Sequence, residues 1–408
     1  MRLWRVPYPK FGKGPGLERV AAIANVLGVD LAGFGVRGAV IVGSNGKGST
    51  AAITAALLQR TGASVGLFTS PHLFDLNERF RIDGEDIADD ELQHHWDRVG
   101  AAVEVAGYTQ ELGGFEFLFL IAADWFAARG CTHTVWEAGI GGRLDPVKLI
   151  RAKNLALTSL DLEHTELLGA TLEDIGLDKI EAAPPGATVY GAIWTSVREV
   201  LARRCEEIGV RYVTTPPYYL ADGKPLPLYG KHQNQNAALA MSLVTALTGL
   251  DEEKLAPRIA ATRWPGRLET LSDDPLVVID VGHTPDAVAA ALAGFQVLAG
   301  DRSRVLIAGA SQDKDVAAII GALAPHFSTI ICAAARHKGT SAPLIAAAAS
   351  AANPQAELVL AEDVADARRL ALARAGADGA IYVAGGLFLA AEFRALHLGR
   401  DPATLLFF

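Results

Sequence analysis

The sequence predicts an α/β protein with two domains, each built on a mainly parallel sheet. Three observations support this class: an apolar strand at 39–42 that breaks into a glycine-rich loop and then a helix, short apolar strands that alternate with helical stretches, and a length of 408 residues, which exceeds one ordinary domain. Alternating strands and helices indicate parallel sheets covered on both faces. We predict domains of residues 1–266 and 267–408.

The first strand leads into a loop that has the pattern of a P-loop. The stretch 38–50 reads GAVIVGSNGKGST, and a good helix sequence follows at Thr50. Glycines let successive backbone N–H groups surround a phosphate, and the helix N-terminus adds its positive dipole end. Lys47 adds a mobile cation, although Gly48 stands where the general pattern has Ser or Thr. We therefore predict a site for ATP at the loop residues Gly43, Ser44, Asn45, Gly46, Lys47, Gly48 and Ser49.

Composition and net charge argue against several classes of binding partner. The formal net charge is −9, which argues against nucleic acids and membrane surfaces as partners. No stretch approaches the length of a membrane span, and the N-terminus does not resemble a signal peptide. Cys131, Cys205 and Cys332 lack metal-ligand spacing and are expected to be buried thiols. We expect a cytoplasmic monomer that acts on small molecules.

Polar residues follow several predicted strands of the first domain. Strands are expected at 64–68, 132–136, 155–160 and 187–190, and helices at 17–27, 115–128 and 172–183. A hairpin-like excursion is expected at 77–84. Function in such sheets lies at the carboxyl ends of the strands. Four residues occupy such ends and are expected to converge: Gly43, Ser70, Glu137 and His164.

Glu137 has the position of a Mg²⁺ ligand in a nucleotide-binding sheet. Mg²⁺ prefers oxygen ligands, keeps several waters and takes one or two carboxylates. Taken alone, Ser70 reads as a helix N-cap before Pro71, and His164 as a strand-end histidine bound to backbone. Together with Glu137, both are predicted to complete the metal shell.

The second domain begins a new alternation after a predicted linker at 263–268, which itself follows a helix at 230–248. Strands are expected at 276–280, 305–308, 329–333, 357–360 and 380–384, with helices between them, which predicts a Rossmann-like domain. Asp280 and His283 lie at the end of its first strand. The alternative for this stretch is an ordinary turn with a helix N-cap at Thr284.

These motifs together resemble the folylpolyglutamate synthase/dihydrofolate synthase family of Mur-ligase-like, ATP-dependent amide ligases. The resemblance covers almost the whole chain. It is carried by GSNGKGS at 43–49, TSPHL at 69–73, NERFRIDG at 77–84, EAGIGGRLD at 137–145, HQNQNAA at 232–238, WPGRLE at 264–269, Asp280–Pro285 and Asp313–Asp315.

The resemblance implies an acid–amino-acid ligase in which ATP phosphorylates a carboxylate of dihydropteroate or a reduced folate and L-glutamate then attacks the acyl phosphate. It implies Mg²⁺ held by Ser70, Glu137 and His164, and a carbamylated Lys179 supporting a second metal ion. From its neighbours alone, Lys179 reads as part of a solvated helix face. The remaining implied roles are contacts to ATP by Asn236, Arg267 and Asp280, a pterin pocket lined by His72 and Asp145, and orientation of glutamate by His283.

The sequence departs from the family pattern mainly on the acceptor and glutamate side. Unusual residues are Pro146, Val147, Lys148, Ile180, Gly282, Thr284, and Gly386 where a serine is customary. Two alternatives therefore stay open: a divergent paralogue that joins another amino acid to another acid, and a nucleotide-binding protein without ligase activity. An oxidoreductase is poorly supported, because neither domain shows a convincing dinucleotide fingerprint.

Overall fold

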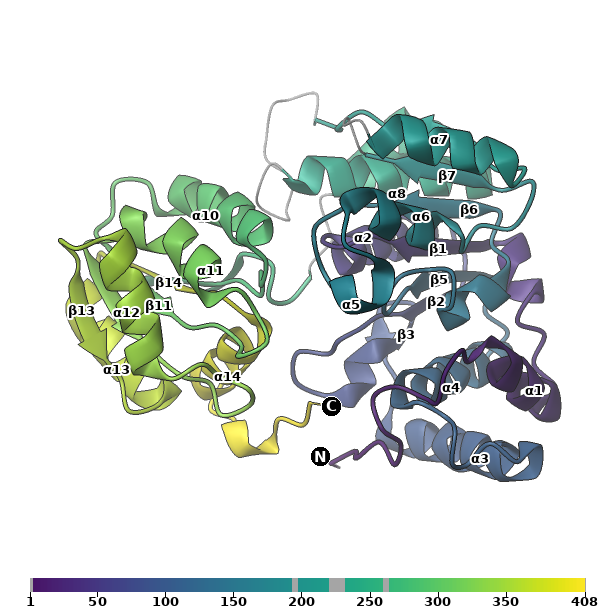
Figure 1. Cartoon of the computed structure of the whole chain (residues 1–408), viewed down its shortest axis with the longest axis horizontal. Coiled ribbons are helices and arrows are strands. Elements are labelled where there is room, and N and C mark those ends of the chain that lie inside the picture. The colour runs from purple at the N-terminus through teal and green to yellow at the C-terminus, as the bar shows by residue number, and fades with distance from the viewer. Residues whose placement is uncertain (1–2, 193–196, 220–231, 260–263, 408) are drawn as a thin grey trace. The chain divides into compact units, whose positions relative to one another are not determined.

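The computed structural model describes residues 3–192, 197–219, 232–259 and 264–407 (Figure 1). These residues divide into two compact units. The described residues up to 219, together with 233–259, form the first unit, and His232 with residues 264–407 forms the second. The sequence-derived boundary at 266/267 remains a prediction for where the folding domains divide.

The first unit is organised by an eight-stranded sheet in the order β4-β3-β2-β5-β1-β6-β7-β8. Strands β2, β5, β1, β6, β7 and β8 pair in parallel, while β3 and β4 are antiparallel and lie at one edge, where the hairpin-like excursion predicted at 77–84 falls. Every residue of β1 is buried, as expected for a central strand covered on both faces. The strands are β1 (Gly38–Val42), β2 (Val65–Phe68), β3 (Phe80–Ile82), β4 (Glu85–Asp86), β5 (His133–Glu137), β6 (Asn154–Leu157), β7 (Thr188–Gly191) and β8 (Arg211–Thr214).

The helices of this unit include several that the sequence predicted closely. Its helices are α1 (Leu17–Leu27), α2 (Lys47–Gln59), α3 (Asp89–Ala106), α4 (Gly114–Ala128), α5 (Thr165–Leu168), α6 (Leu172–Ile180), α7 (Val197–Glu207), α8 (His232–Thr248) and α9 (Glu252–Ile259). The predicted helix at 230–248 begins in residues outside the described part. Sequence reasoning did not identify α3, which is polar over much of its surface and packs against α1 and α4.

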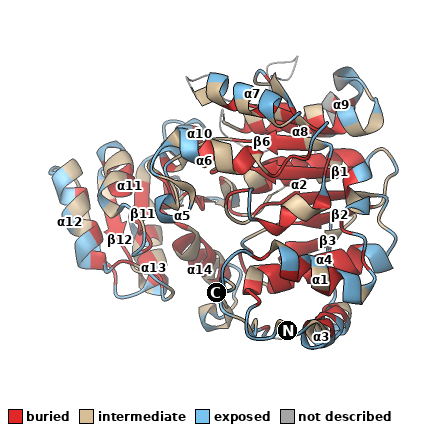
Figure 2. Ribbon diagram, turned by 45° about the vertical axis from the view of Figure 1, so that its right-hand side comes forward, coloured by how far each residue is buried: buried red, intermediate tan, exposed pale blue. Residues whose placement is uncertain are grey.

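A cluster of aromatic side chains forms the core between α4 and the first sheet. Trp136 on β5 is fully buried and lies 5.0 Å from Phe119 and 5.2 Å from Phe126, measured between ring centroids. Both rings belong to α4, whose residues are buried on most of its circumference, as predicted (Figure 2). The packing anchors the strand that ends in Glu137.

The second unit has a six-stranded sheet in the order β13-β12-β11-β14-β10-β9. All neighbours are parallel except β9, an antiparallel edge strand that the sequence did not predict. Residue 263 of the predicted linker lies outside the described residues, and Leu268 at its other end is buried in this unit's core. The strands are β9 (Glu269–Asp273), β10 (Leu276–Ile279), β11 (Arg304–Ala308), β12 (Thr329–Cys332), β13 (Glu357–Leu360) and β14 (Ala380–Ala384).

The helices of the second unit form two rows. In one row α11 packs against both α10 and α12, and in the other α13 packs against α14. The rows lie on opposite faces, because right-handed crossovers place the three helices that move the chain from β10 to β13 on one face and the helix that returns it to β14 on the other. The helices are α10 (Pro285–Ala299), α11 (Val316–Leu323), α12 (Ala342–Ala352), α13 (Val364–Ala375) and α14 (Leu387–His397).

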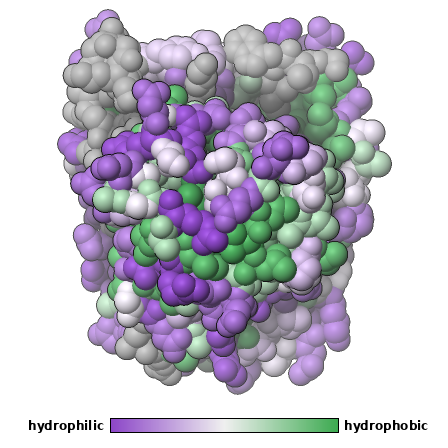
Figure 3. Space-filling view, turned by 90° about the vertical axis from the view of Figure 1, so that its left-hand side faces the viewer, coloured by the Kyte–Doolittle hydropathy of each residue, from purple (hydrophilic) through white to green (hydrophobic). Residues whose placement is uncertain are grey.

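The surface carries scattered apolar side chains. On the face shown in Figure 3, apolar surface gathers near the centre, with hydrophilic side chains around it. No helix in the described part of the chain is long and apolar enough to cross a membrane. All three cysteines are free thiols. Cys205 and Cys332 are buried as expected, whereas Cys131, in the turn before β5, is only half-buried.

Candidate functional site

The P-loop is shaped by two glycines that no other residue could replace without strain. Gly43 has φ 141° and Gly46 has φ 87°, both in the region that favours glycine. A Cβ atom on Gly43 would lie 1.9 Å from the Thr158 hydroxyl, and one on Gly46 would lie 2.5 Å from Oδ1 of Asn236. Helix α2 begins at Lys47, earlier than the predicted start at Thr50, so part of the loop sequence forms its first turn.

The loop is held by the segment that follows β6. The Ser44 N–H donates to the Ser159 carbonyl at 2.8 Å, and the Asn45 N–H donates to the Ser159 hydroxyl at 3.0 Å. The Asp161 N–H donates to the Ser44 hydroxyl at 3.0 Å. These bonds fix the loop before any ligand binds. The sequence did not assign Ser159 or Asp161 a role: Ser159 lies within the strand predicted at 155–160, which ends earlier, at Leu157, and Asp161 directly follows the predicted strand.

Two lysines meet at one carbonyl of the P-loop. Lys47 Nζ donates to the Gly43 carbonyl at 2.8 Å and to the Ser44 carbonyl at 3.1 Å. Lys179 Nζ, on α6, donates to the same Gly43 carbonyl at 3.1 Å. The Lys179 side chain is only 1% exposed. The interpretation of Lys179 as part of a solvated helix face is therefore wrong: its side chain is buried beside the P-loop.

Glu163 supplies the negative charge for this pair of ammonium groups. Its Oε1 lies 3.0 Å from Lys179 Nζ, and its side chain is 12% exposed. Burial opposes ionisation of Glu163, but the charges of Lys47 and Lys179 outweigh it and lower the pKa of Glu163 to about 2. Burial and the charge of Lys47 lower the pKa of Lys179. Glu163 was not predicted, although it directly precedes the predicted ligand His164.

Ser70 and Glu137 come together at the carboxyl ends of β2 and β5. The Ser70 N–H donates to Oε2 of Glu137 at 2.9 Å, and Glu137 is 4% exposed. Nearby, Arg79 Nε donates to Nδ1 of the buried His72 at 2.9 Å. Because that nitrogen accepts, the proton of the neutral ring is on Nε2. Arg79, which the sequence interpretation left without a role, thus fixes the tautomer of His72.

A hydroxyl and a carboxylate at adjacent strand ends fit the oxygen ligands that Mg²⁺ prefers. His164 lies farther along the segment after β6, with φ 46°, as the N-cap residue of α5. Across the ranges that the structure describes, no group of three or more His, Cys, Asp or Glu side chains is arranged to hold a metal ion. Of the three predicted Mg²⁺ ligands, only Glu137 and His164 are of these types, and the third is Ser70. The assignment of this metal site therefore stays a prediction.

Asp145 shapes the loop that follows β5. Its Oδ2 accepts from the N–H groups of Gly139 and Ile140 at 2.9 and 3.2 Å, and its Oδ1 accepts from Val147 at 3.0 Å. Burial raises the pKa of Asp145 to about 6, against these hydrogen bonds and the charge of Lys47. The predicted contact of Asp145 with a pterin therefore competes with its bonds to the loop.

Asn236 lies beside the P-loop, as the predicted ATP contact requires. Its Nδ2 donates to Oε1 of Gln233 at 2.8 Å, and Gln233 Nε2 in turn donates to the Ser49 hydroxyl at 3.4 Å. Gln233 was not singled out from the sequence. Its position in the quoted HQNQNAA motif was the available signal.

In the second unit, Asp280 and His283 follow β10. The Asp280 carboxylate is buried and accepts the N–H groups of Leu268 and Gly282 at 3.0 and 2.7 Å. Burial raises the pKa of Asp280, and the charge of Arg267 opposes that shift. The Thr284 side chain caps α10 by accepting from the Ala287 N–H. The alternative interpretation of this stretch, a capped helix start, is thus correct at Thr284 and does not exclude a role for His283.

Comparison with known proteins agrees with this architecture. The family described as "Mur ligase, glutamate ligase domain" matches residues 266–387. The chain is 32% identical to the folylpolyglutamate synthase of Lacticaseibacillus casei over 71% of this chain and 74% of that protein. It is 33% identical to a probable bifunctional folylpolyglutamate synthase/dihydropteroate synthase of Halobacterium salinarum over 94% of this chain. The chain spans about half the length of that relative.

Solved structures show the same fold. Mycobacterium tuberculosis folylpolyglutamate synthase, complexed with ADP and AMPPCP, superposes with a TM-score of 0.85 at 26% identity, over 95% of this chain and 96% of that one. E. coli FolC in complex with DHPP and ADP also gives a TM-score of 0.85, at 26% identity over 96% and 95% of the chains. The two-unit α/β architecture, the P-loop and these similarities together establish that the chain belongs to the folylpolyglutamate synthase family of Mur-type ligases.

Proposed function

We propose that the protein is an ATP-dependent ligase that joins L-glutamate to a carboxylate of dihydropteroate or a reduced folate through an acyl phosphate. One observation carries the proposal: two ammonium groups, Lys47 and Lys179, converge on the P-loop carbonyl of Gly43 with Glu163 beside them. A binding module needs one cation for phosphate. A second, buried lysine at the same carbonyl indicates chemistry on the phosphate.

The chain's own residues would act on ATP through electrostatics. The N–H groups of the P-loop and of the first turn of α2 bind the phosphates, aided by the helix dipole. When ATP binds, the ammonium group of Lys47 would donate to the outer phosphate oxygens in place of the loop carbonyls. It would then stabilise the negative charge that develops as the phosphoryl group is transferred to the acceptor carboxylate. Carried over from the family, Asn236, Arg267 and Asp280 contact the nucleotide.

Ser70 and Glu137 are proposed to hold Mg²⁺, with His164 as a further ligand carried over from the family. A bound Mg²⁺ would neutralise phosphate charge and help to orient the transferred group. The hydrogen bond between Ser70 and Glu137 orients the carboxylate toward the shared strand edge. A similar protein, the bifunctional folylpolyglutamate synthase/dihydrofolate synthase of Yersinia pestis, has been solved in complex with AMPPNP and a Mn ion.

Lys179 is proposed to be carbamylated, as the resemblance implies. Its amine would add to carbon dioxide and release a proton, giving an anion in place of an ammonium. Its lowered pKa favours the neutral amine that this reaction needs. The carbamate would then support a second metal ion. Labelling with ¹³C carbon dioxide, followed by ¹³C NMR of wild type and Lys179→Arg, tests this modification; no carbamate resonance in wild type rules it out.

For the substrates, His72 and Asp145 are proposed to line the pterin pocket, and His283 to orient glutamate so that its amino group attacks the acyl phosphate. His72 can donate through Nε2, because Arg79 occupies Nδ1. We further propose that the protein works as a monomer on these small molecules, since the P-loop cluster is built from residues of one chain.

A second candidate is a divergent paralogue that joins another amino acid to another acid. Asp145 favours it, because its carboxylate already accepts three backbone N–H groups of the loop in which Pro146, Val147 and Lys148 depart from the family.

The test measures phosphate release from ATP with Mg²⁺ and L-glutamate, comparing dihydropteroate, tetrahydrofolate and no acceptor. We expect release that depends on a pterin, with the glutamylated product identified by mass. If ATP binds but neither dihydropteroate nor tetrahydrofolate triggers phosphate release, the proposed substrates are wrong. A panel of other carboxylic acids and amino acids then tests the divergent paralogue.

A further inference from the structure

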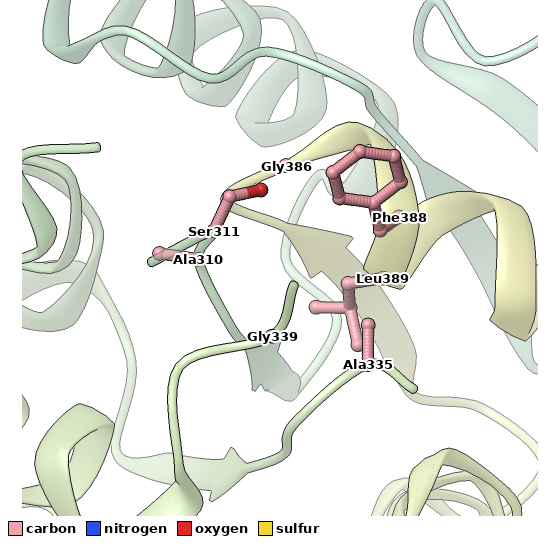
Figure 4. A pocket seen from close by; sticks show the side chains of 7 residues that line it. All are labelled: Ala310, Ser311, Ala335, Gly339, Gly386, Phe388 and Leu389. Carbon is pink, nitrogen blue, oxygen red and sulfur yellow. The ribbon is translucent and has the colours of Figure 1, made fainter. Parts of the chain in front are cut away.

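Helix α14 is fixed at its first turn. Phe388 and Leu389 line a small pocket there, and Leu389 is only 3% exposed (Figure 4). The Phe388 ring packs against His337 and Phe407, with ring centroids 4.6 and 4.8 Å away. Because a hydrogen-bonded helix is stiff along its length, an anchored first turn determines where the side chains of the last turn lie.

The last turn of α14 binds the edge strand β9 at two points. Arg394 Nε donates to Oε1 of Glu269 at 2.7 Å, and His397 Nε2 donates to the Leu271 carbonyl at 3.1 Å. The side chains of Arg394 and Glu269 are only 17% and 20% exposed, so solvent screens this ion pair little. The ion pair therefore connects β9 to a helix that is itself held in place.

The second oxygen of the Glu269 carboxylate holds the turn that precedes β9. We call Gly266, Arg267 and Leu268 the Arg267 turn. Oε2 of Glu269 accepts the Gly266 N–H at 2.7 Å, and the Asp280 carboxylate accepts the Leu268 N–H at 3.0 Å. Two carboxylates thus hold the backbone on both sides of Arg267.

The backbone of the Arg267 turn is strained. Gly266 has φ 72° and Leu268 has φ 44°, both in the left-handed region. Glycine adopts this region freely, whereas leucine does so at a cost in free energy and needs its surroundings to hold it there. The Leu268 side chain is 2% exposed and lies in the core of the second unit. Strain of this kind is typical of ligand-binding sites, which indicates that the turn does more than join two elements.

The side chain that the turn presents indicates its role. Nε of Arg267 is buried and has no hydrogen-bond partner in the part of the chain that the structure describes. The Asp280 carboxylate is bonded to the N–H groups of Leu268 and Gly282 instead. A buried donor without a partner is costly, so its presence indicates a ligand that supplies the acceptor. A guanidinium group is well suited to phosphate oxygens.

We propose that Glu269 and Arg394 form a positioning pair, which holds the Arg267 turn so that the Arg267 guanidinium is ready to bind a phosphate of ATP. The inference rests on the proposed ligase function, in which Arg267 contacts the nucleotide. Glu269 and Arg394 act through Arg267 rather than on the nucleotide itself. Holding the turn strengthens binding because less conformational freedom is lost when the ligand binds.

A double-mutant cycle distinguishes a positioning pair from an ion pair that only stabilises the fold. Isothermal titration measures the dissociation constant of AMPPNP with Mg²⁺ for wild type, Glu269→Ala, Arg267→Met and the double variant. Glu362→Ala, at an exposed glutamate of the same unit, is the matched control. Glu269→Gln is the conservative variant, because its amide oxygen can still accept the Gly266 N–H. Circular dichroism confirms that each variant is folded.

We expect Arg267→Met to weaken AMPPNP binding roughly 10- to 100-fold, as for the loss of a hydrogen bond between charged groups. Glu269→Ala should weaken it roughly 10-fold on its own, but by less than about twofold when Arg267 is already replaced, because coupled residues are not additive. Glu269→Gln should lose less affinity than Glu269→Ala, and Glu362→Ala should match wild type.

Two results overturn the inference. One is an unchanged affinity for AMPPNP in Glu269→Ala. The other is an equal loss with and without Arg267, because a general structural defect does not depend on that side chain. If Glu269→Ala does not fold, Arg394→Gln takes its place in the cycle. It removes the charge from the other side of the ion pair, with the same expected dependence on Arg267 and the same refuting results.

This binding measurement needs no turnover, so it separates the inference from the proposed function. If neither pterin supports phosphate release, the proposed substrates are wrong, but a loss in Glu269→Ala that disappears without Arg267 still supports the positioning pair. If Arg267→Met binds AMPPNP like wild type, the proposed nucleotide contact and the positioning pair are both wrong, whereas pterin-dependent phosphate release would still support the ligase.

Discussion

Glu163 provides the sharpest test of the charge arrangement at the P-loop. In protein whose Lys179 is not carbamylated, Glu163→Gln keeps the shape of the side chain but removes its charge, which leaves the ammonium groups of Lys47 and Lys179 without their shared counterion. At the observed 3.0 Å, and with an effective dielectric constant of about 20, the Glu163–Lys179 attraction is about 5 kcal/mol. The residual exposure of Glu163 and the ion's own desolvation cost reduce the net effect. We expect a loss of about 3 kcal/mol in the free energy of unfolding of the first unit.

The same substitution should strengthen nucleotide binding in the absence of metal. Glu163 repels the phosphates that Lys47 and Lys179 attract, and a unit charge about 8 Å away at the same dielectric constant contributes about 2 kcal/mol. The dissociation constant for ATP in EDTA should therefore fall by roughly 10- to 30-fold. Destabilisation together with tighter binding is an unusual combination, and general damage to the fold would not produce it.

Urea unfolding and isothermal titration with ATP measure the two effects. Glu166→Gln is the matched control, because Glu166 is an exposed carboxylate three residues farther along the same segment. It should change neither quantity by more than a few tenths of a kcal/mol. If Glu163→Gln weakens metal-free ATP binding, or unfolds at the same urea concentration as wild type, Glu163 does not balance the two lysines as argued.

Three further predictions test other parts of the site and fold. Lys47→Ala should lower the rate of phosphate release roughly 100- to 1,000-fold with the circular dichroism spectrum unchanged, because transition-state charge loses its cation; an unaltered kcat removes that role. Glu116→Gln should lower the free energy of unfolding by about 3 kcal/mol, because Glu116 accepts hydrogen bonds from Nε and Nη2 of the buried Arg19 at 2.8 and 2.6 Å. Urea unfolding measures this loss, with Glu18→Gln, at an exposed residue, as the control. Equal unfolding midpoints for Glu116→Gln and wild type would contradict the buried ion pair. For Asp145, the folded pKa of about 6 lies above the ordinary 3.8, so the folded state binds its proton more readily and this group adds stability as pH falls from 6 toward 3.8. That contribution is about 3 kcal/mol. Urea unfolding of wild type and Asp145→Asn at pH 7 and at pH 4 measures it. The free energy of unfolding of wild type, relative to that of Asp145→Asn, should rise by about this amount as the pH falls.

Local chain features explain why much of the fold was predictable. The helix at Leu17–Leu27 has the predicted bounds, because apolar periodicity and the glycine that ends it, Gly28, agree there. Strand β9 and helix α3 were missed, the first because an edge strand has little apolar alternation and the second because most of α3 is polar. Neither element has the signal that burial on one face normally leaves in a sequence.

The sequence by itself determined the fold class, the P-loop and the family, since each is written in short contiguous motifs whose glycines and strand-to-helix order leave few alternatives. Only the tertiary structure decided how distant residues combine. It buried Lys179 against the Gly43 carbonyl, paired it with Glu163, and directed the Asp145 carboxylate to the backbone N–H groups of its own loop. The physical reason is that charge and hydrogen-bond partners depend on distance in space, and residues far apart along the chain meet only when parallel strands end at a common edge.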